Sequence, residues 1–364
     1  MFVKELRLQQ FRNYGDETVV FHPKVNIIAG KNAQGKTNLL EAISIMSMGK
    51  SFRTRKDSEM IGFGKEFCRA SCVYLHGDRE RSIEIEIRKD GKKAKVDGVP
   101  AEKNIDLLEN IYIVVFSPDD LKIVKEEPEK RRKFIDRELC QIKPVYYRNL
   151  ARYKKVLLQR NNLLKSERCS RSAVEAWDHL LAEYGAKIMM ERDGFLKKIN
   201  QISSRLHADI TAGREKLELG YESDLPRREI FEDQRDVFLK ILADSFEKDI
   251  QKGNTGKGPH KDDIRISVNG IDVRHFGSQG QQRTAALSMK LAEISLIKQE
   301  TGEEAILLLD DVLSELDEER QKFLTHSLNE VQLFITTAEL NSELLETLPE
   351  HKIYWVERGK ISGK

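Results

Sequence analysis

Apolar and polar residues alternate over much of the first third of the chain, and this pattern predicts β-strands. Turn dipeptides such as Asp90-Gly91 and Asp97-Gly98 separate several of these segments, as in β-hairpins. One helix interrupts the strands, because apolar residues repeat at helical spacing within 36–48. The strands expected in this part cover residues 2–11, 25–29, 69–76, 82–88, 93–97 and 111–116, the last of them apolar throughout.

From about residue 119 to residue 250 the apolar positions lie three and four residues apart, which is typical of helices that pack against one another. One series covers 146–157 and a second covers 174–188. The first series meets Arg160 where an apolar residue is due, so a long coiled coil is not expected. The pattern predicts a short helical subdomain.

Residues 251–364 return to alternating helices and strands. Asn269-Gly270 marks a hairpin. The strand-rich ends flank the helical insert, so we expect the two ends to form one domain. Helices are expected at about 280–300 and 315–329, and strands at 305–310, 332–337 and near 353–361.

Composition excludes several classes of protein. The 62 basic and 60 acidic residues leave a net charge of +2, so only local clusters could favour nucleic-acid binding. No run approaches the roughly 18 apolar residues of a membrane span, and the first residues lack the apolar stretch of a secretion signal. The four cysteines, two of them Cys68 and Cys72 without companions at zinc spacing, indicate reduced thiols of a cytoplasmic protein.

The segment 30–37 fits the phosphate-loop pattern G-x-x-x-x-G-K-[ST], and it joins an expected strand to an expected helix. Its glycines let backbone N–H groups curl around phosphate oxygens, and the helix N-terminus adds partial positive charge. Lys36 is placed to reach the β- and γ-phosphates, and Thr37 to ligate Mg²⁺. The expected ATP-binding residues are Gly30, Lys31, Asn32, Ala33, Gln34, Gly35, Lys36 and Thr37.

A second candidate element is the apolar strand that ends in Asp310-Asp311. In P-loop NTPases an acid in this position holds Mg²⁺. Asp310 is the expected metal ligand, and Asp311 is placed to orient or deprotonate the attacking water, which makes both acids catalytic candidates beside Lys36. The alternative is a buried strand followed by an acidic helix cap.

A third phosphate-ready segment precedes the helix expected at 280–300, where a serine stands beside a glycine at a helix N-terminus. One chain has little use for two such sites on one nucleotide. Two subunits related by C₂ symmetry, facing head to tail, would share two nucleotides between them. The alternative is an ordinary glycine-rich helix cap. The residues of this segment are Gly277, Ser278, Gln279, Gly280 and Gln281.

Together these motifs resemble the set found in ABC-type ATPases. Segment 277–281 is similar to the signature motif, and Ser314-Glu315-Leu316-Asp317 is similar to the D-loop, with Ser314 and Asp317 as its site residues. Ser278 follows Lys36 by 242 residues, which is typical of the branch related to chromosome-maintenance and double-strand-break-repair ATPases. The resemblance implies an α/β fold, an ABC-type P-loop ATPase head with a β-rich N-terminal lobe and an inserted helical arm. The expected domains are lobe I at 1–118, the arm at 119–250 and lobe II at 251–364.

Within that branch the chain resembles the RecF family of bacterial recombination mediators over essentially its whole length. The resemblance implies a protein that binds ATP with Mg²⁺, dimerises on ATP and binds double-stranded DNA or single-/double-strand junctions. It also implies action with RecR and RecO to load RecA at single-strand gaps, with roles in DNA replication and the SOS response. The supporting segments are 11–14, 51–54, 116–121, 131–136 and 258–263.

The chain also departs from the general ABC pattern. Asp311 stands where transporters usually have Glu, Thr337 takes the place of the switch histidine, and no glutamine is evident near Ser117-Pro118. We therefore expect slow hydrolysis, and the resemblance implies that it depends on DNA and resets a clamp. These departures and the long spacing argue against a transporter subunit. A structural chromosome-maintenance ATPase is the other alternative, but a helix at 145–168 would give roughly 36 Å, which is short for a coiled-coil arm.

Basic clusters at 50–56, 88–95 and 130–133 are the candidates for DNA contact. Such clusters make salt-sensitive phosphate contacts that are indifferent to base sequence. A solvated charged face is the alternative for each of them. Ser51–Arg53 could instead touch the nucleotide, and His260 could serve the nucleotide, a partner or the fold. The DNA-binding candidates are Lys92, Lys93, Lys95, Arg131 and Arg132.

Overall fold

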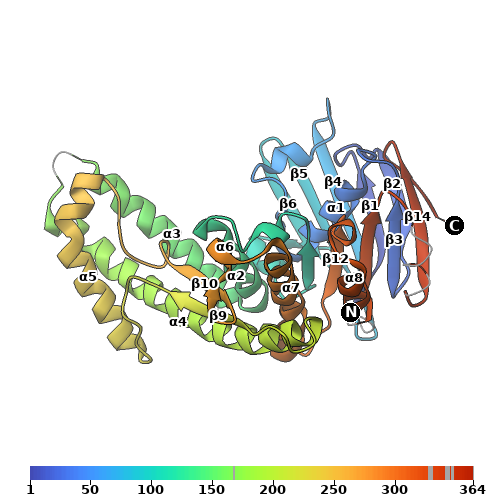
Figure 1. Cartoon of the computed structure of the whole chain (residues 1–364). Helices are drawn as coiled ribbons and strands as arrows, with labels where there is room; N and C mark the ends of the chain where they lie inside the picture. The colour runs from blue at the N-terminus through green and yellow to red at the C-terminus, as the bar shows by residue number, and fades with distance from the viewer. Residues whose placement is uncertain (167–168, 327–330, 341–344, 346–347, 364) are drawn as a thin grey trace. The chain divides into compact units, whose positions relative to one another are not determined.

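The computed structural model describes residues 1–363 except 167–168, 327–330, 341–344 and 346–347, and the chain divides into two compact units (Figure 1). Unit 1 combines Met1–Lys122 with Ala286–Lys364, and unit 2 is Ile123–Ala285. The two ends of the chain therefore form one unit, as the sequence predicts. The second boundary falls later than the expected residue 250, because the hairpin after it pairs with a strand of the arm.

Unit 1 contains two six-stranded sheets. One is antiparallel with the order β2-β1-β4-β5-β6-β7, and the other, β15-β14-β3-β13-β12-β8, is parallel except for β15. The elements of the first segment are β1 (Phe2–Gln9), β2 (Asp16–Val20), β3 (Val25–Ala29), α1 (Lys36–Met48), η1 (Asp57–Met60), β4 (Phe67–His76), β5 (Arg79–Arg88), β6 (Gly91–Val96), β7 (Val99–Ala101), η2 (Asn104–Leu107), β8 (Ile113–Phe116) and η3 (Asp120–Lys122). Those of the second are β12 (Ile306–Asp310), η4 (Leu313–Glu315), α8 (Glu318–His326), β13 (Leu333–Thr337), β14 (His351–Glu357) and β15 (Lys360–Gly363).

The hydrophobic core of unit 1 surrounds helix α1 and joins both sheets. Besides the expected apolar stripe, α1 also buries Ala42, Ser44 and Ser47, so the helix is covered on nearly all sides. Ser44 and Ser47 satisfy their hydroxyls by donating to backbone carbonyls one turn earlier. This burial fixes the helix that follows the phosphate loop.

Two predicted hairpin turns form as the sequence indicates. Asp97 and Gly98, at φ +50° and +77°, connect the paired residues Val96 and Val99 of β6 and β7. A two-residue turn with two positive φ angles matches the twist of its strands, and Asp-Gly tolerates it. In unit 2, Asn269-Gly270 makes the same kind of turn.

Unit 2 consists of packed helices and a three-stranded sheet of order β11-β10-β9. The strand β9 lies inside the stretch that the sequence predicts as helical.

The predicted helix at 145–168 ends at Leu164, and residues 167–168 lie outside the described part. Residues 327–329 of the helix expected at 315–329 lie outside it as well. The elements are α2 (Pro128–Ile142), α3 (Pro144–Leu164), α4 (Arg171–Ile210), β9 (Leu217–Glu222), α5 (Phe231–Lys252), β10 (Asp263–Val268), β11 (Ile271–Asp272) and α6 (Val273–Phe276), with α7 (Gln279–Thr301) crossing the boundary.

Arg160, which interrupts the apolar series of α3, is the centre of a buried ion cluster. Its side chain is 0% exposed, and its Nε lies 2.5 Å from Asp178 Oδ1 on α4. Its NH1 lies 2.7 Å from Asp249 Oδ2 on α5 and 2.8 Å from Thr255 Oγ1. A buried charge is tolerated only when it is paired, and both aspartates pair with Arg160. The cluster therefore links α3, α4 and α5 at a position where an apolar residue is expected.

His260 serves the fold of unit 2. Its Nδ1 lies 2.7 Å from the Tyr153 hydroxyl and its Nε2 lies 2.9 Å from the Thr255 carbonyl oxygen. The carbonyl can only accept, so Nε2 carries the proton and Nδ1 accepts from Tyr153. Burial lowers the pKa of His260 to about 4, which keeps the ring neutral at physiological pH.

This buried histidine predicts a pH-dependent loss of stability. The unfolded chain protonates the ring near pH 6.5 and the folded chain only near pH 4, so the unfolded state binds more protons between these values. Stability should therefore fall as the pH drops from 6.5 towards 4. His260→Gln keeps a donor and an acceptor without titrating, so its melting temperature should fall less than that of the wild type between pH 7 and pH 5. Equal losses in the two proteins would contradict this assignment.

Among the described residues, none of the helices is long and apolar enough to cross a membrane.

Candidate nucleotide-binding site and signature loop

The loop Gly30–Thr37 joins strand β3 to helix α1 at the predicted position. The Lys36 side chain is buried and its Nζ donates to the carbonyl oxygens of Gly30, at 2.7 Å, and Lys31, at 3.2 Å. Gly35 has φ +121°, and a Cβ there would lie 2.7 Å from Asn13 Nδ2. The glycine is therefore required by both conformation and close approach. The cation and the start of α1 lie together, which is the arrangement that binds phosphate.

Thr37 and Asp310, predicted as metal ligands, are in direct contact. The Thr37 hydroxyl donates to Asp310 Oδ1 at 2.8 Å, although 273 residues separate them. The Thr336 hydroxyl lies 3.0 Å from the same oxygen. Burial raises the pKa of Asp310, and the negative charge of the adjacent Asp311 adds to the rise. The hydrogen bonds from Thr37 and Thr336 oppose it. The carboxyl is thus held at the end of β12 beside the phosphate loop.

Thr336 is a site residue that sequence reasoning missed. It is the register partner of Asp310 on β13, and its hydroxyl also accepts the backbone N–H of Asp311 at 2.9 Å. Thr337, the residue at the predicted switch position, donates its hydroxyl to the Glu339 carbonyl oxygen. Only the pairing of β12 with β13 singles out Thr336.

The acid after Asp310 has an unusual backbone conformation. Asp311 adopts φ +54°, which side-chain-bearing residues rarely do and which is common at functional sites. The Ser314 hydroxyl of the predicted D-loop donates to the Asp311 carbonyl oxygen at 2.8 Å. Asp317 accepts the Arg320 N–H at 3.0 Å and so caps α8. The D-loop therefore fixes the backbone of Asp311, and Asp317 has a structural role as well.

The oxygen set of this site suits Mg²⁺. The hydroxyl of Thr37 and the carboxylate of Asp310 are hard ligands, which Mg²⁺ prefers. Within the described parts of the chain, no group of three or more His, Cys, Asp or Glu side chains could hold a metal ion. A site with few protein ligands fits an ion that keeps several waters and binds substrate phosphates.

Ser51–Arg53 lies beside α1, next to the phosphate loop. Arg53 NH1 donates to Asn38 Oδ1 at 2.6 Å, and its positive charge opposes the rise in the Asp310 pKa. Ser51 donates to the fully buried Glu41, which also binds the Arg12 guanidinium at 2.7 and 2.8 Å. The sequence leaves open whether Ser51–Arg53 contacts DNA or the nucleotide, and this placement favours the nucleotide.

The signature loop lies in unit 2 and forms the N-terminal cap of α7. Ser278 Oγ accepts from Gln281 N–H at 3.2 Å, and Gln281 Oε1 accepts from Ser278 N–H at 3.0 Å. This is a capping box. Gln281 Nε2 also donates to Glu215 Oε1 at 2.9 Å. Because Oγ is only an acceptor in the cap, its own proton can still be donated to a phosphate oxygen.

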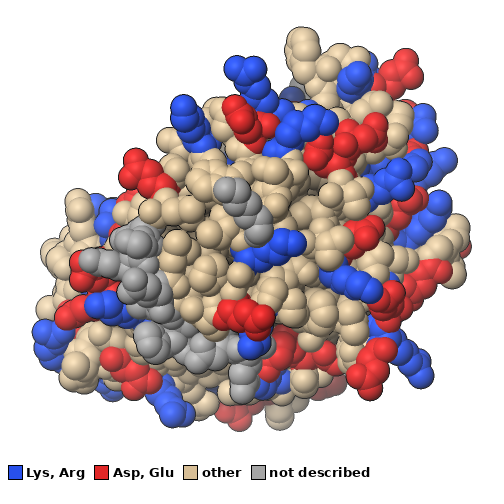
Figure 2. Space-filling view, turned by 90° about the vertical axis from the view of Figure 1, so that its right-hand side faces the viewer, with Lys and Arg blue, Asp and Glu red and all other residues tan. Residues whose placement is uncertain are grey.

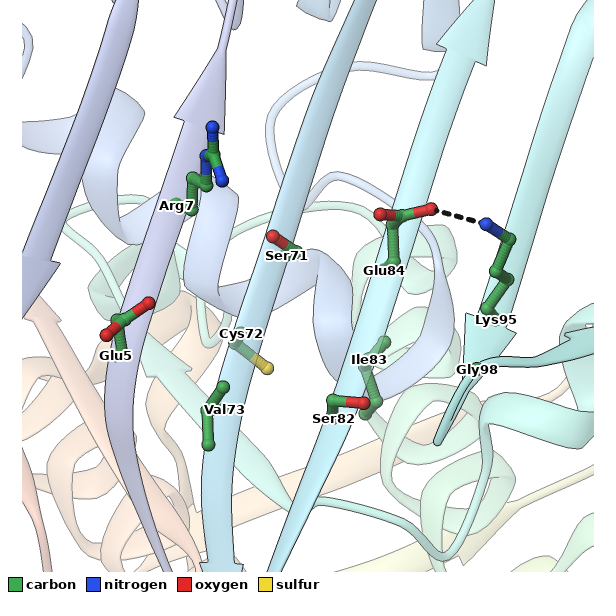
Figure 3. Close-up of a pocket in the computed structure, with 10 residues that line it drawn as sticks. All are labelled: Glu5, Arg7, Ser71, Cys72, Val73, Ser82, Ile83, Glu84, Lys95 and Gly98. Atoms are coloured by element: carbon green, nitrogen blue, oxygen red, sulfur yellow. Dashed lines mark ion pairs between the residues drawn. The ribbon is translucent and has the colours of Figure 1, made fainter.

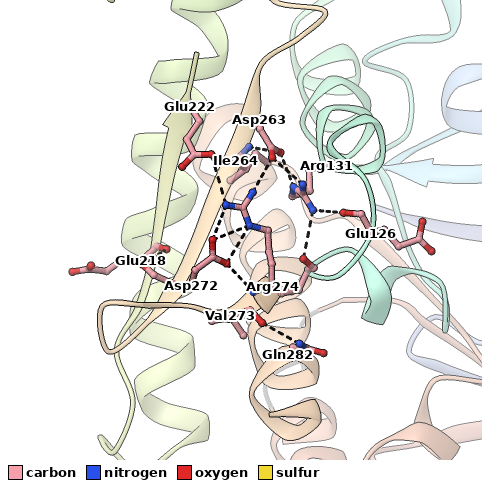
Figure 4. A network of polar contacts seen from close by, with 12 residues as sticks. Glu126, Arg131, Glu218, Glu222, Asp263, Ile264, Asp272, Val273, Arg274 and Gln282 are labelled. Carbon is pink, nitrogen blue, oxygen red and sulfur yellow. Dashed lines mark hydrogen bonds and ion pairs between the residues drawn. The ribbon is translucent and has the colours of Figure 1, made fainter. Parts of the chain in front are cut away.

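An ion network holds the short helix α6 immediately before that loop (Figure 4). Asp263 accepts from Arg131 at 2.6 and 2.9 Å and from Arg274 at 2.9 Å, while Arg274 also binds Asp272 at 2.7 Å. A Cβ on Gly277 would lie 2.3 Å from a methyl carbon of Val273 in α6. The signature segment therefore starts from a fixed turn.

Two of the DNA-binding candidates, Arg131 and Arg132, are engaged within unit 2. Arg131 is only 2% exposed and its guanidinium is engaged by Asp263. Arg132 is half-buried and donates to the Asp262 carbonyl oxygen at 2.6 Å. Both arginines serve the fold of unit 2, which argues against phosphate contact.

The three lysine candidates lie on β6 and differ from one another. Lys92 Nζ is bound to Asp57 at 2.9 Å and to the Gly49 carbonyl oxygen, so it anchors the strand. Lys93 and Lys95 are exposed, and Lys95 makes an ion pair with Glu84 on the outer face of the antiparallel sheet (Figure 3). Of the five DNA-binding candidates, Lys93 and Lys95 are therefore the two that are exposed.

The fold and the site define the class of protein. Strand β3, the phosphate loop, α1, the acid pair after β12 and a capped signature loop make an ABC-type P-loop ATPase head. The family model described as RecF/RecN/SMC N terminal domain matches residues 2–360. The SmcHead bound to the C-winged helix domain of ScpA has a similar fold at 17% identity, with a TM-score of 0.57 over 100% of this chain and 98% of that chain.

Closer relatives are RecF proteins. The DNA replication and repair protein RecF of Alkaliphilus oremlandii is 44% identical over 99% of this chain and 100% of its own length. That of Clostridioides difficile is 43% identical, over 99% and 98%. The solved structure of the recombination mediator protein RecF-ATPrS in the RecFOR pathway matches at 36% identity with a TM-score of 0.93, over 100% and 98%. The chain belongs to the RecF family.

Proposed function

We propose that this chain is an ATP-gated DNA-binding protein of recombinational repair. The contact between Thr37 of the phosphate loop and Asp310 at the end of β12 carries the proposal, because it joins the phosphate and metal ligands of one nucleotide site. Relatives with this fold are RecF proteins, and one solved relative is RecF-ATP in the RecFOR pathway, with a TM-score of 0.92 at 36% identity.

Each residue of the site has a role in this proposal. Backbone N–H groups of Gly30–Thr37 hold the phosphates, and Lys36 leaves its two carbonyl partners to reach the β- and γ-phosphates. Thr37 and Asp310 would hold Mg²⁺, which supplies positive charge to the phosphates when bound. Asp311, fixed by Thr336 and the D-loop, orients the attacking water. With the shorter acid and no switch histidine, hydrolysis is slow and resets the clamp.

Two copies of the chain would complete each site. Ser278 is held by its own capping box with a hydroxyl proton available, as a contact to the γ-phosphate on a second copy requires. C₂ symmetry would then pair each phosphate loop with the signature loop of the other copy. ATP would be the cross-link between the two subunits, so dimerisation and DNA binding depend on it.

In the cell we propose action with RecR and RecO to promote RecA loading at single-strand gaps, with roles in DNA replication and the SOS response. The likeness to RecF structures from the RecFOR pathway supports this assignment.

DNA contact through phosphates predicts binding that depends on salt and ATP but not on base sequence. Figure 2 shows Lys and Arg side chains interspersed with Asp and Glu on the face it displays. Of the lysine candidates on β6, the exposed Lys93 and Lys95 would carry the contact. Affinity for duplex DNA, measured by fluorescence anisotropy with ATP, should fall steeply between about 50 and 200 mM salt. Equal affinity at both concentrations, or without ATP, would refute the proposal.

The architecture of unit 2 argues against the structural chromosome-maintenance alternative. The 40 residues of α4 span about 60 Å, more than the sequence suggested. However, α3, α5 and a three-stranded sheet pack along α4 within one compact unit. A two-helix arm that could reach a distant hinge does not occur among the described residues.

A further inference from the structure

The turn between β14 and β15 lies against the phosphate loop, although more than 300 residues separate them in the sequence. The backbone N–H of Gly359 donates to the Gln34 carbonyl oxygen at 3.1 Å, and that of Arg358 donates to Gln34 Oε1 at 2.8 Å. Asn13 Nδ2 donates to the same Gln34 carbonyl oxygen at 2.8 Å. Gln34 therefore has its side chain and its backbone held from outside the loop.

Packing around this turn leaves no space for another side chain. Gly359 has φ +72°, and a Cβ there would lie 2.2 Å from the Asn13 carbonyl oxygen. Gly30 directly follows the neighbouring strand β3, and a Cβ there would lie 2.3 Å from the Val356 carbonyl oxygen. The hairpin backbone thus contacts both the first glycine of the phosphate loop and the segment that braces Gln34.

Arg358 and Gly359 form a two-residue hairpin turn between the paired residues Glu357 and Lys360, and both have positive φ angles. Arg358 adopts φ +46°, a region that Asn or Gly would occupy more easily than a residue with a long side chain. Asp97-Gly98 and Asn269-Gly270 have the same pair of positive φ angles, so the conformation follows from the hairpin turn itself. Here the positive φ accompanies an Arg358 N–H that bonds to Gln34.

We propose that Arg358 and Gly359 are positioning residues for the phosphate loop. Their N–H groups hold Gln34 so that the next residues, Gly35 and Lys36, present their own groups to the phosphates. The inference rests on the proposed function, since it concerns the same nucleotide site. It adds that ATP affinity depends on a turn that contacts the loop at Gln34 and lies outside the motif.

A pair of glycine substitutions tests this. Gly359→Ala introduces a Cβ against Asn13 in a left-handed turn. Gly98→Ala is the matched control, because Gly98 has φ +77° in the two-residue β6–β7 turn and no atom lies within 4 Å of its Cβ position. Both variants carry the same backbone strain. By calorimetry, Gly359→Ala should bind ATP at least about tenfold more weakly than the wild type, and Gly98→Ala within about twofold.

Hydrogen exchange on the wild-type chain keeps the test independent of how a variant folds. If the turn positions the loop, ATP must in return stabilise the turn. The Gly359 amide should exchange more slowly with ATP bound, and the amides of the β6–β7 turn should not change. Unchanged exchange at Gly359, or a folded Gly359→Ala with wild-type affinity, overturns the inference alone. Failure of the wild-type chain to bind ATP would overturn the proposed function with it.

Discussion

Lys36→Met should lower the affinity for ATP by about a hundredfold or more, because it removes the charge-assisted bond to the β- and γ-phosphates. The fold should survive. Methionine is close to lysine in length, and the change costs only the two Nζ bonds to the Gly30 and Lys31 carbonyl oxygens. Calorimetric titration with ATP measures the effect, together with a melting curve that confirms folding.

Lys89→Met is the matched control for this substitution. It removes the same charge from an exposed lysine between β5 and β6, outside the phosphate loop. Its ATP affinity should equal that of the wild type. A folded Lys36→Met chain with wild-type affinity would show that the nucleotide site has been placed wrongly.

Ser278→Arg should abolish ATP-dependent dimerisation while the monomer still binds ATP. The phosphate loop in unit 1 is untouched, so its own nucleotide loses no contact. A long cationic side chain cannot fit where Gly277 and Ser278 let a second copy approach. Hydrolysis and ATP-dependent DNA binding should disappear with the dimer. Mass in solution with and without ATP is the measurement.

Two further variants separate the trans contact from damage to α7. Ser278→Arg also removes the helix cap, which costs about 1 kcal/mol. Ser278→Ala loses the same cap without adding bulk, so it should dimerise more weakly than the wild type but not fail. Ser172→Arg places the same side chain at an exposed serine of α4 and should behave as wild type. A Ser278→Arg monomer that no longer binds ATP, or a normal dimer, would contradict the shared site.

Local sequence patterns predicted the elements that carry the nucleotide site. The spacing of apolar residues predicted α1 at 36–48, and the structure has Lys36–Met48. The phosphate-loop pattern identifies the loop glycines, and the acidic end of an apolar run identifies Asp310 at the end of β12. These features follow from backbone conformation and neighbouring residues, which a sequence displays directly.

Features that depend on distant pairing were not predictable in this way. The sequence pattern predicts helix at β9, and only pairing with β10 makes this segment a strand. Thr336 contacts Asp310 because of the register of β12 with β13. Arg131 is not available for DNA because Asp263, 132 residues away in the sequence, binds its guanidinium. Arg358 and Gly359 belong to no motif, and only the fold brings them to Gln34.

The most direct test of the shared nucleotide site is a mixing experiment with Lys36→Met and Ser278→Arg. Each variant alone should stay monomeric with ATP, as measured by light scattering. In a mixed dimer, the intact phosphate loop of one chain would face the intact Ser278 of the other, which leaves one of two sites whole. The account predicts that an equimolar mixture recovers part of the dimer and of the ATP hydrolysis. A mixture that stays monomeric and inactive, while the wild type dimerises under the same conditions, would contradict it.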